Sequence, residues 1–166
     1  IAADKKGKVV GCAIGENFHE PVELPAVDNF APIFALFEEL AKPIKHLRFV
    51  PNTVIHIWIT AVDDSVQGGG LSTRLNNACV IRAIEQGFKY VYCEFTNEIN
   101  EKIMKYYPES IRLNKIDLAD FDFNGEKPFK TLKSSASAYL TPAAPFHRLE
   151  PLSSEIANYQ YKKDKS

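Results

Sequence analysis

The feature that most constrains the fold of this chain is a succession of strand, glycine loop, helix and strand in its middle third. The uninterrupted apolar run Val54–Val62 leads through a short polar turn to three consecutive glycines, Gly68–Gly70. A strand that passes through glycines into a helix presents bare backbone N–H groups and the positive end of the helix dipole to an anion. The segment therefore predicts a phosphate-binding loop. The alternative is a tight connection without a ligand, since glycines also serve backbone geometry alone.

The spacing of apolar residues predicts the elements around this loop. Val54–Val62 is too continuously apolar for a half-exposed strand, so we expect it to be covered on both faces. Apolar residues recur at helical spacing over 71–86, and Gly87 is a suitable C-terminal stop. A second buried strand over 88–96 completes a βαβ unit, for which parallel strands and a right-handed crossover are expected. Another helix is predicted over 98–107.

The flanking segments predict further strands and one more helix. Two apolar runs within residues 1–14 surround a polar turn and predict a β-hairpin, followed by a loop over 15–28. A helix is predicted over 30–44, capped by Asn29, with Pro43 ending it or bending its last turn. The remaining predictions are strands at 110–118 and 135–140, a turn at Asn124-Gly125, and a frayed tail over 150–166.

Composition excludes several classes of function. The 166 residues carry 20 basic and 21 acidic side chains, so no net field attracts nucleic acid or an anionic membrane. No apolar run approaches the ~20 residues of a membrane-spanning helix. The three cysteines lack a Cys-x-x-Cys spacing, which is typical of a reducing compartment. We therefore expect one cytoplasmic domain, 1–166, monomeric or homodimeric, without a metal, nucleic-acid or membrane site.

The spacing around the glycines is more specific than the glycines alone. Gln67, Gly70 and Ser72 form the pattern Gln-x-x-Gly-x-Ser. It resembles the acetyl-coenzyme A signature of GNAT-type N-acetyltransferases, which is Arg/Gln-x-x-Gly-x-Gly/Ala after a strand. A dinucleotide loop needs Gly-x-Gly-x-x-Gly and a P-loop ends in Gly-Lys-Ser/Thr, and neither is present. The Gly87-Phe88 turn and Asn97 near the end of the second strand extend the resemblance.

The resemblance implies an α/β (α+β) fold of the GNAT acyl-coenzyme A N-acyltransferase type. Such a fold has a mixed, mostly antiparallel sheet with a central parallel, splayed strand pair and flanking helices. The helical segment before Val54 and the stretch Asp117–Phe121 are similar to the arylalkylamine N-acetyltransferase-like branch. Since the chain begins at Ile1 and its only methionine is Met104, we expect the first strand and first helices of the family to lie upstream.

The activity implied by the resemblance is transfer of an acetyl group from acetyl-coenzyme A to a primary amine, by direct attack within a ternary complex. The acceptor would be a small-molecule amine or a peptide amine. Strand-end backbone groups would pair with pantetheine, an N–H near Val62 would stabilise the oxyanion, and the loop would wrap the pyrophosphate. The residues expected to bind the co-substrate are Thr60, Ala61, Val62, Gln67, Gly68, Gly69, Gly70, Leu71, Ser72 and Asn97.

The catalytic acid is not where the resemblance places it. Counting from Asn97, the acid tyrosine of the family falls on Met104, which cannot donate a proton. Tyr106 and Tyr107 follow directly, and either could replace it or pack in the core. The missing acid motivates an alternative function, a catalytically weak or inactive coenzyme A-binding regulatory module of the same fold.

The candidates for the catalytic base lie on the two predicted central strands. They are His56 and Glu94, with Asp63 at a strand end, and each could instead be structural. Strand alternation places Trp58 on the same face as His56 and Thr60. There Trp58 could line a pocket for an aromatic amine or fill the core.

Overall fold

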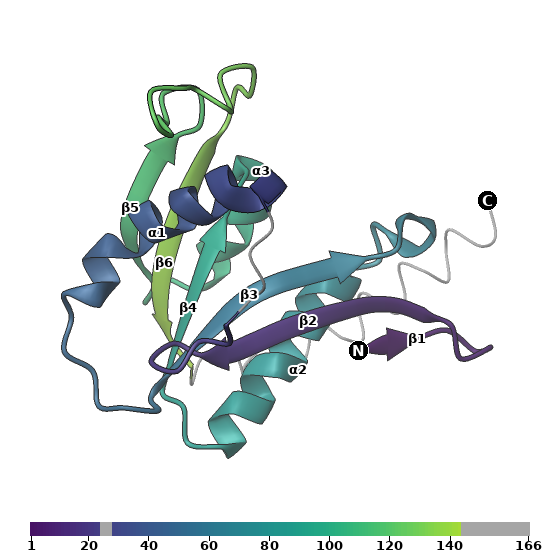
Figure 1. Ribbon diagram of the computed structural model, residues 1–166. Helices are drawn as coiled ribbons and strands as arrows, with labels where there is room; N and C mark the ends of the chain where they lie inside the picture. Colours follow the sequence, from purple (N-terminus) through teal and green to yellow (C-terminus); the bar gives the residue numbers. More distant parts are fainter. Residues whose placement is uncertain (24–27, 144–166) are drawn as a thin grey trace.

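Six strands form one mixed sheet in the computed structural model, which describes residues 1–23 and 28–143 (Figure 1). Their order across the sheet is β1-β2-β3-β4-β6-β5, and β3 and β4 run parallel while the other neighbours run antiparallel. This confirms the predicted sheet. The strands are β1 (Ala2–Ala3), β2 (Val9–Asn17), β3 (Val54–Val62), β4 (Tyr90–Phe95), β5 (Ile111–Asp117) and β6 (Ser135–Pro142).

Helices cover both faces of the sheet (Figure 1). On one face, α1 packs over β5 and β6, and its buried Leu36, Leu40 and Ile44 share a core with Val54 and Tyr92. On the other face, α2 packs against β2 and β3, and residues of alternate parity from the same strands form a second core. The helical elements are η1 (Asp28–Phe30), α1 (Ala31–Lys45), η2 (Asp64–Val66), α2 (Leu71–Glu85), α3 (Glu98–Glu101) and η3 (Lys102–Tyr106).

The parallel strands β3 and β4 separate halfway along their length. Their pairing runs from Val54 opposite Tyr90 to Ile57 opposite Cys93, and no later pair follows among the described residues. Beyond that point β3 stays paired with β2 as far as Val62, while β4 stays paired with β6 as far as Phe95. Each strand follows its antiparallel partner, so the two diverge (Figure 1). The splayed pair that the resemblance implied is confirmed.

A β-bulge lies where the separation begins. Ile57 pairs with Gly15 but Ile59 pairs with Ile14, so Trp58 is an extra residue in β3. An extra residue inverts the alternation of side chains beyond it. Thr60 accordingly donates a hydrogen bond to Asn76 in α2. The prediction that Trp58, His56 and Thr60 share one face is therefore wrong for Thr60.

Three predicted features of the elements differ from those observed, and the alternatives left open at Pro43 are decided. β2 extends to Asn17, so the first residues of the predicted loop 15–28 belong to a strand paired with β3. Asn29 does not cap α1, because a 3-10 turn precedes the helix and Phe30 takes that position without a side-chain hydrogen bond. Pro43 lies inside α1, which continues to Lys45. The predicted helix 98–107 is one short α-helix, α3, followed by the 3-10 helix η3.

The remaining elements lie where the sequence predicted them, with boundaries that differ by about one or two residues. α2 ends at Glu85 and is followed by Gly87 at φ 95°, a left-handed conformation that suits glycine. Asn124 and Gly125 form a turn at φ 54° and 83°, with Phe123 bridged to Glu126. The predicted tail over 150–166 lies outside the described residues.

The contact between β2 and α2 gives a stability prediction. A Cβ atom at Gly15 would lie 2.8 Å from the Sγ of Cys79 and 3.3 Å from the Cδ1 of Ile57. We expect Gly15→Val to lower the free energy of unfolding by about 1–3 kcal/mol, because overpacking must push α2 off the sheet. Urea denaturation measures this loss. In a Cys79→Ala background the same substitution should cost less, and an equal cost in both backgrounds would contradict the packing account.

Candidate functional site

The glycine loop connects the diverging end of β3 to the N-terminus of α2. Gly68 and Gly70 have φ values of 82° and 68°, in the left-handed region that other residues rarely adopt. A Cβ atom at Gly68 would meet nothing within 4 Å, so the backbone there is open to a ligand. The loop leads into the fifteen-residue helix α2, whose first-turn N–H groups have no partner within the helix. This geometry suits phosphate groups.

Polar contacts hold the turn before the glycines. Asp63 accepts hydrogen bonds from the hydroxyl and the backbone N–H of Ser65, and the Nζ of Lys8 lies 3.0 Å from its Oδ2. The Ser65 hydrogen bonds and the charge of Lys8 lower the pKa of Asp63 to about 2. The Nε2 of Gln67 donates to the Oδ1 of Asp64. Asp63 is therefore engaged in building the loop, which leaves it poorly suited to act as a base.

A cavity of about 620 Å³ occupies the space between the separating strands on the α2 side of the sheet. We call it the α2-side cavity. Apolar side chains from both strands meet polar side chains of α2 and the residues of η3 in its walls. Its lining includes Thr60, Ser72, Thr73, Asn76, Asn77, Cys93, Glu94, Asn100, Met104, Tyr106 and Tyr107. The other residues expected to bind coenzyme A, Ala61, Val62 and Gln67–Leu71, continue from its wall along β3 and the loop.

Asn97 plays a structural part beside this cavity. Its Oδ1 accepts a hydrogen bond of 2.8 Å from the backbone N–H of Asn100 and caps α3. Sequence reasoning did not identify Asn76 and Asn77 as candidates, although both line the cavity. The sequence does indicate them indirectly. They follow Ser72 and Thr73 by four residues each, and this spacing places the four polar side chains on one face of α2.

The two candidate tyrosines differ in their surroundings. Tyr107 is 2% exposed, and its hydroxyl lies 3.5 Å from the Oδ1 of Asn77. Burial, with a smaller contribution from Cys93, raises the pKa of Tyr107 to about 12, so its hydroxyl stays protonated at neutral pH. Tyr106 is 58% exposed, with the Nζ of Lys105 4.8 Å from its ring centroid. Of the two, Tyr107 is held inside the protein.

A second cavity of about 450 Å³ lies on the opposite, α1 side of the sheet. We call it the α1-side cavity. Aromatic rings form much of its wall, and carboxylates lie among them. Its lining includes Glu16, Phe18, Phe34, Phe37, Glu38, Lys45, His56, Trp58, Tyr92 and Glu94. Phe37, Trp58 and Glu94 also line the α2-side cavity, so the two cavities adjoin where β3 and β4 separate.

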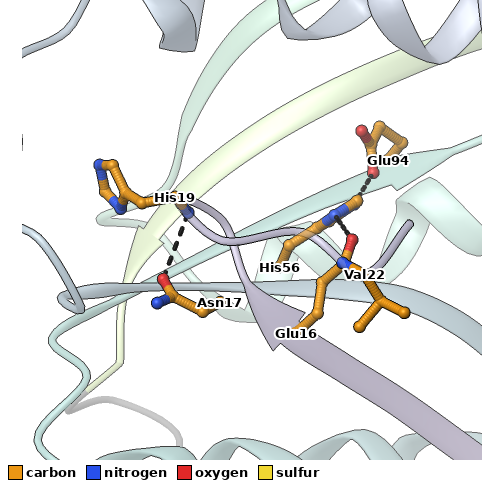
Figure 2. Close-up of polar contacts among 6 residues, drawn as sticks. All are labelled: Glu16, Asn17, His19, Val22, His56 and Glu94. Carbon is orange, nitrogen blue, oxygen red and sulfur yellow. Dashed lines mark hydrogen bonds and ion pairs between the residues drawn. The ribbon is translucent and has the colours of Figure 1, made fainter.

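Three titratable side chains from neighbouring strands meet in the wall of the α1-side cavity (Figure 2), and one of them, Glu94, also lines the α2-side cavity. The Nδ1 of His56 lies 3.1 Å from the Oε1 of Glu16, and its Nε2 lies 2.7 Å from the Oε2 of Glu94. The side chains of His56, Glu16 and Glu94 are 12%, 16% and 6% exposed. We call this group the Glu–His–Glu cluster.

The cluster favours the charged form of the His56 imidazole. Burial lowers the pKa of His56, but the hydrogen bonds and charges of Glu94 and Glu16 outweigh burial and leave the pKa raised above its ordinary value. Both ring nitrogens face carboxylate oxygens, so both donate when the ring is protonated. Glu16 is itself held, because its Oε2 accepts a hydrogen bond of 3.0 Å from the backbone N–H of Val22 (Figure 2).

Across residues 1–23 and 28–143, no three His, Cys, Asp or Glu side chains come together so as to hold a metal ion. In the same part of the chain, every helix falls short of the length and hydrophobicity needed to cross a membrane.

Comparison with known proteins identifies relatives of this architecture. The model of the acetyltransferase (GNAT) family matches residues 1–110. No curated protein sequence matches significantly. Among solved structures, arylalkylamine N-acetyltransferase 2 from Aedes aegypti superposes with a TM-score of 0.66 at 19% identity, covering 85% of this chain and 71% of that one.

Two further structures are similar at comparable levels. The C-terminal condensation domain of Ebony, in complex with beta-alanyl-dopamine, has a TM-score of 0.67 at 17% identity, covering 82% of this chain and 68% of that one. A polyamine N-acetyltransferase from Drosophila melanogaster has a TM-score of 0.62 at 17% identity, covering 82% and 71%. At such identities the likeness concerns the fold.

Proposed function

The chain belongs to the GNAT acetyltransferase family, and from this we propose that it transfers an acetyl group from acetyl-coenzyme A to a primary amine by direct attack within a ternary complex. One observation carries the proposal. Two cavities on opposite faces of the sheet adjoin at Trp58 and Glu94, where β3 and β4 separate. A donor in one cavity and an acceptor in the other would bring thioester and amine together without a covalent enzyme intermediate.

The donor would occupy the α2-side cavity and the glycine loop. The open backbone at Gly68 and the N-terminus of α2 fit a pyrophosphate. Within the part of the chain that the structure describes, no strand pairs with β3 beyond Ile57 on its β4 side, so the backbone of Thr60–Val62 is available to pair with pantetheine amides. Gln67 and Leu71–Ser72 flank the glycines and complete the proposed binding segment. Asn97 would contribute by holding α3 beside the ligand.

The acceptor would enter the α1-side cavity. Its carboxylates attract an ammonium group, and Phe18, Phe34 and Trp58 offer apolar surface to an aromatic body. Glu38 at the cavity wall is paired with Lys45, so its negative charge is offset and attracts a second cationic group less strongly. We therefore propose a small amine with one positive charge, in keeping with the arylalkylamine-like branch, in preference to a polyamine or a peptide.

The chemistry needs a base for the ammonium proton and an acid for the departing thiolate. Glu94 lines both cavities and His56 lies beside it in the wall of the α1-side cavity, and these two are the candidates for the base. Tyr107 and Tyr106 are the candidates for the acid. Tyr107 is favoured, because it is buried in the wall of the donor cavity and keeps its proton at neutral pH.

The proposal is tested by ligand binding and turnover together. Acetyl-coenzyme A should raise the melting temperature of the protein, and an aromatic monoamine should release free thiol from it faster than a polyamine or a peptide. No thermal shift at saturating acetyl-coenzyme A would refute the donor site. Faster turnover of the polyamine would refute the proposed acceptor class.

The alternative function is a coenzyme A-binding regulatory module. Met104 lies in the cavity wall at the position where the family resemblance places the acid tyrosine, which favours this reading. A clear thermal shift without thiol release across the amine panel would support it.

The free cysteines Cys12, Cys79 and Cys93 support a cytoplasmic location for either function. We also propose that the protein is a monomer or a homodimer.

A further inference from the structure

The Glu–His–Glu cluster brings a residue into the site for which the sequence offered no role. Glu16 lies directly opposite His56 in the antiparallel register of β2 and β3. Tyr92 lies beside His56 in the parallel register of β3 and β4, and Glu94 follows two residues later on the same face. One imidazole thus connects carboxylates from two different strands, across the point where β3 begins to separate from β4.

We propose that Glu16 is a positioning residue, which acts through His56 to hold Glu94 as the carboxylate that takes the proton from the acceptor. This inference rests on the proposed acetyl transfer and assigns separate roles within it. His56 is the fixed cation between two anions, while Glu94 lines both cavities and can reach the reacting nitrogen.

The geometry favours Glu94 over His56 as the base. Both ring nitrogens of His56 face carboxylate oxygens within 3.1 Å, so the protonated ring has no lone pair to offer a substrate. His56 engages one oxygen of Glu94, Oε2, and we assign the proton transfer to the other, Oε1. The backbone N–H of Val22 donates a hydrogen bond to Glu16 and so holds the Glu16 side chain in place.

The reaction proceeds with balanced protons. The acceptor enters as an ammonium ion, and Glu94 takes one proton from it. The freed lone pair forms a C–N bond to the thioester carbonyl carbon, and the C–S bond breaks with its electron pair passing to sulfur. Tyr107 gives a proton to the thiolate and is restored by the second proton that nitrogen loses. Glu94 then releases its proton to solvent.

Loss of the proton from His56 should break one of the two contacts of the cluster and so loosen the position of Glu94. A neutral imidazole has one N–H, so one ring nitrogen would then turn a lone pair toward a carboxylate and repel it. Activity should therefore fall on the alkaline side as His56 deprotonates. The charged and titratable groups that surround His56 are Glu16 from β2, Tyr92 and Glu94 from β4, and Glu38 and Lys45 from α1.

Removing the Glu16 charge provides the test. Glu16→Gln keeps an oxygen that can accept from Nδ1 but removes one of the anions that hold the proton on His56. We expect kcat to fall on the order of 10²-fold, as for a misplaced catalytic group, with the KM for acetyl-coenzyme A unchanged. The alkaline limb of the kcat profile should move to lower pH, and an NMR titration of His56 should show the same movement.

Two variants distinguish positioning from a general effect of charge or structure. Glu38→Gln removes the same charge from the same cavity but no hydrogen bond of His56, so it should move the alkaline limb much less than Glu16→Gln does. Glu16→Asp retains the charge, so the alkaline limb of its kcat profile should lie closer to the wild-type pH than that of Glu16→Gln. If Glu16→Gln lowers kcat without moving the limb, or leaves both unchanged, Glu16 does not position Glu94.

The inference and the proposed function fail in different ways. If the wild-type protein acetylates amines and Glu16→Gln does so identically, only the positioning role of Glu16 is refuted. A wild-type protein that releases no thiol with any amine overturns the acetyl transfer and the assigned role of Glu94 with it. In that case the NMR titration still measures whether Glu16 sustains the charge on His56.

Discussion

Substitution of Gly68 by aspartate should abolish the rise in melting temperature that acetyl-coenzyme A produces. The φ of 82° disfavours a side chain, and the added carboxylate would lie where the pyrophosphate is proposed to bind. A ligand at 100 times its Kd stabilises a protein by about 2.7 kcal/mol. For a chain of this size that corresponds to roughly 5–10 °C, and the variant should lose nearly all of it. Thermal denaturation at several ligand concentrations measures the effect.

The chain provides a closely matched control for this variant. Gly125 has a φ of 83°, and a Cβ atom there would also meet nothing within 4 Å, but it lies in the turn before β6. Gly125→Asp therefore imposes a similar backbone cost and the same change of charge outside the proposed site. It should lower the melting temperature without reducing the ligand-dependent rise. Equal ligand responses in the two variants would show that the loop does not bind acetyl-coenzyme A.

Substitution of Tyr107 by phenylalanine should lower kcat on the order of 10²-fold or more, the usual effect of losing a general acid. The hydroxyl lies in the donor cavity near Asn77, and its pKa of about 12 keeps it protonated at neutral pH. The thermal shift with acetyl-coenzyme A should remain, since the ring still packs in the core. Steady-state kinetics, measured beside the melting temperature, separate loss of chemistry from loss of folding.

Tyr106→Phe provides the comparison for Tyr107→Phe. Tyr106 precedes Tyr107 in the chain and lines the same cavity, but its ring is mostly exposed. If Tyr106→Phe loses most of its turnover while Tyr107→Phe keeps normal turnover, the exposed Tyr106 is the acid. Normal turnover in both variants would exclude a tyrosine acid in this protein.

The central unit was predictable because local properties specify it. A continuous apolar run forms a buried strand, helical spacing forms α2, and glycines permit the left-handed turns at each end of that helix. α2 begins at the predicted residue and ends one residue before the predicted end. The prediction was wrong at Asn29. A 3-10 turn precedes α1, so Phe30 and not Asn29 occupies the capping position.

The Trp58 bulge shows why the site was harder to predict. Alternation along β3 is a sound rule only while the register with β2 is constant, and the register shifts at Trp58. The shift turns Thr60 toward Asn76 on the α2 side and leaves His56 on the α1 side. Nothing in a single sequence marks the extra residue, because its position depends on the strand beside it.

The Glu–His–Glu cluster depends in the same way on strand pairing. Glu16 lies in a stretch whose mixed polarity and nearby prolines predicted a loop, yet it continues β2 because pairing with β3 satisfies its backbone. Only that pairing brings Glu16 opposite His56, forty residues later in the chain. A loop conformation would have left His56 with Glu94 alone.

The sequence by itself determined the loop that is proposed to bind the donor, the helix behind it and the family to which the chain belongs, since these depend on short-range backbone preference and residue spacing. Tertiary structure alone decided where β3 and β4 separate, which side chains meet between them, and how the two cavities adjoin. Those features arise because each central strand is paired on its outer side with a different antiparallel neighbour, and follows that neighbour away from the other.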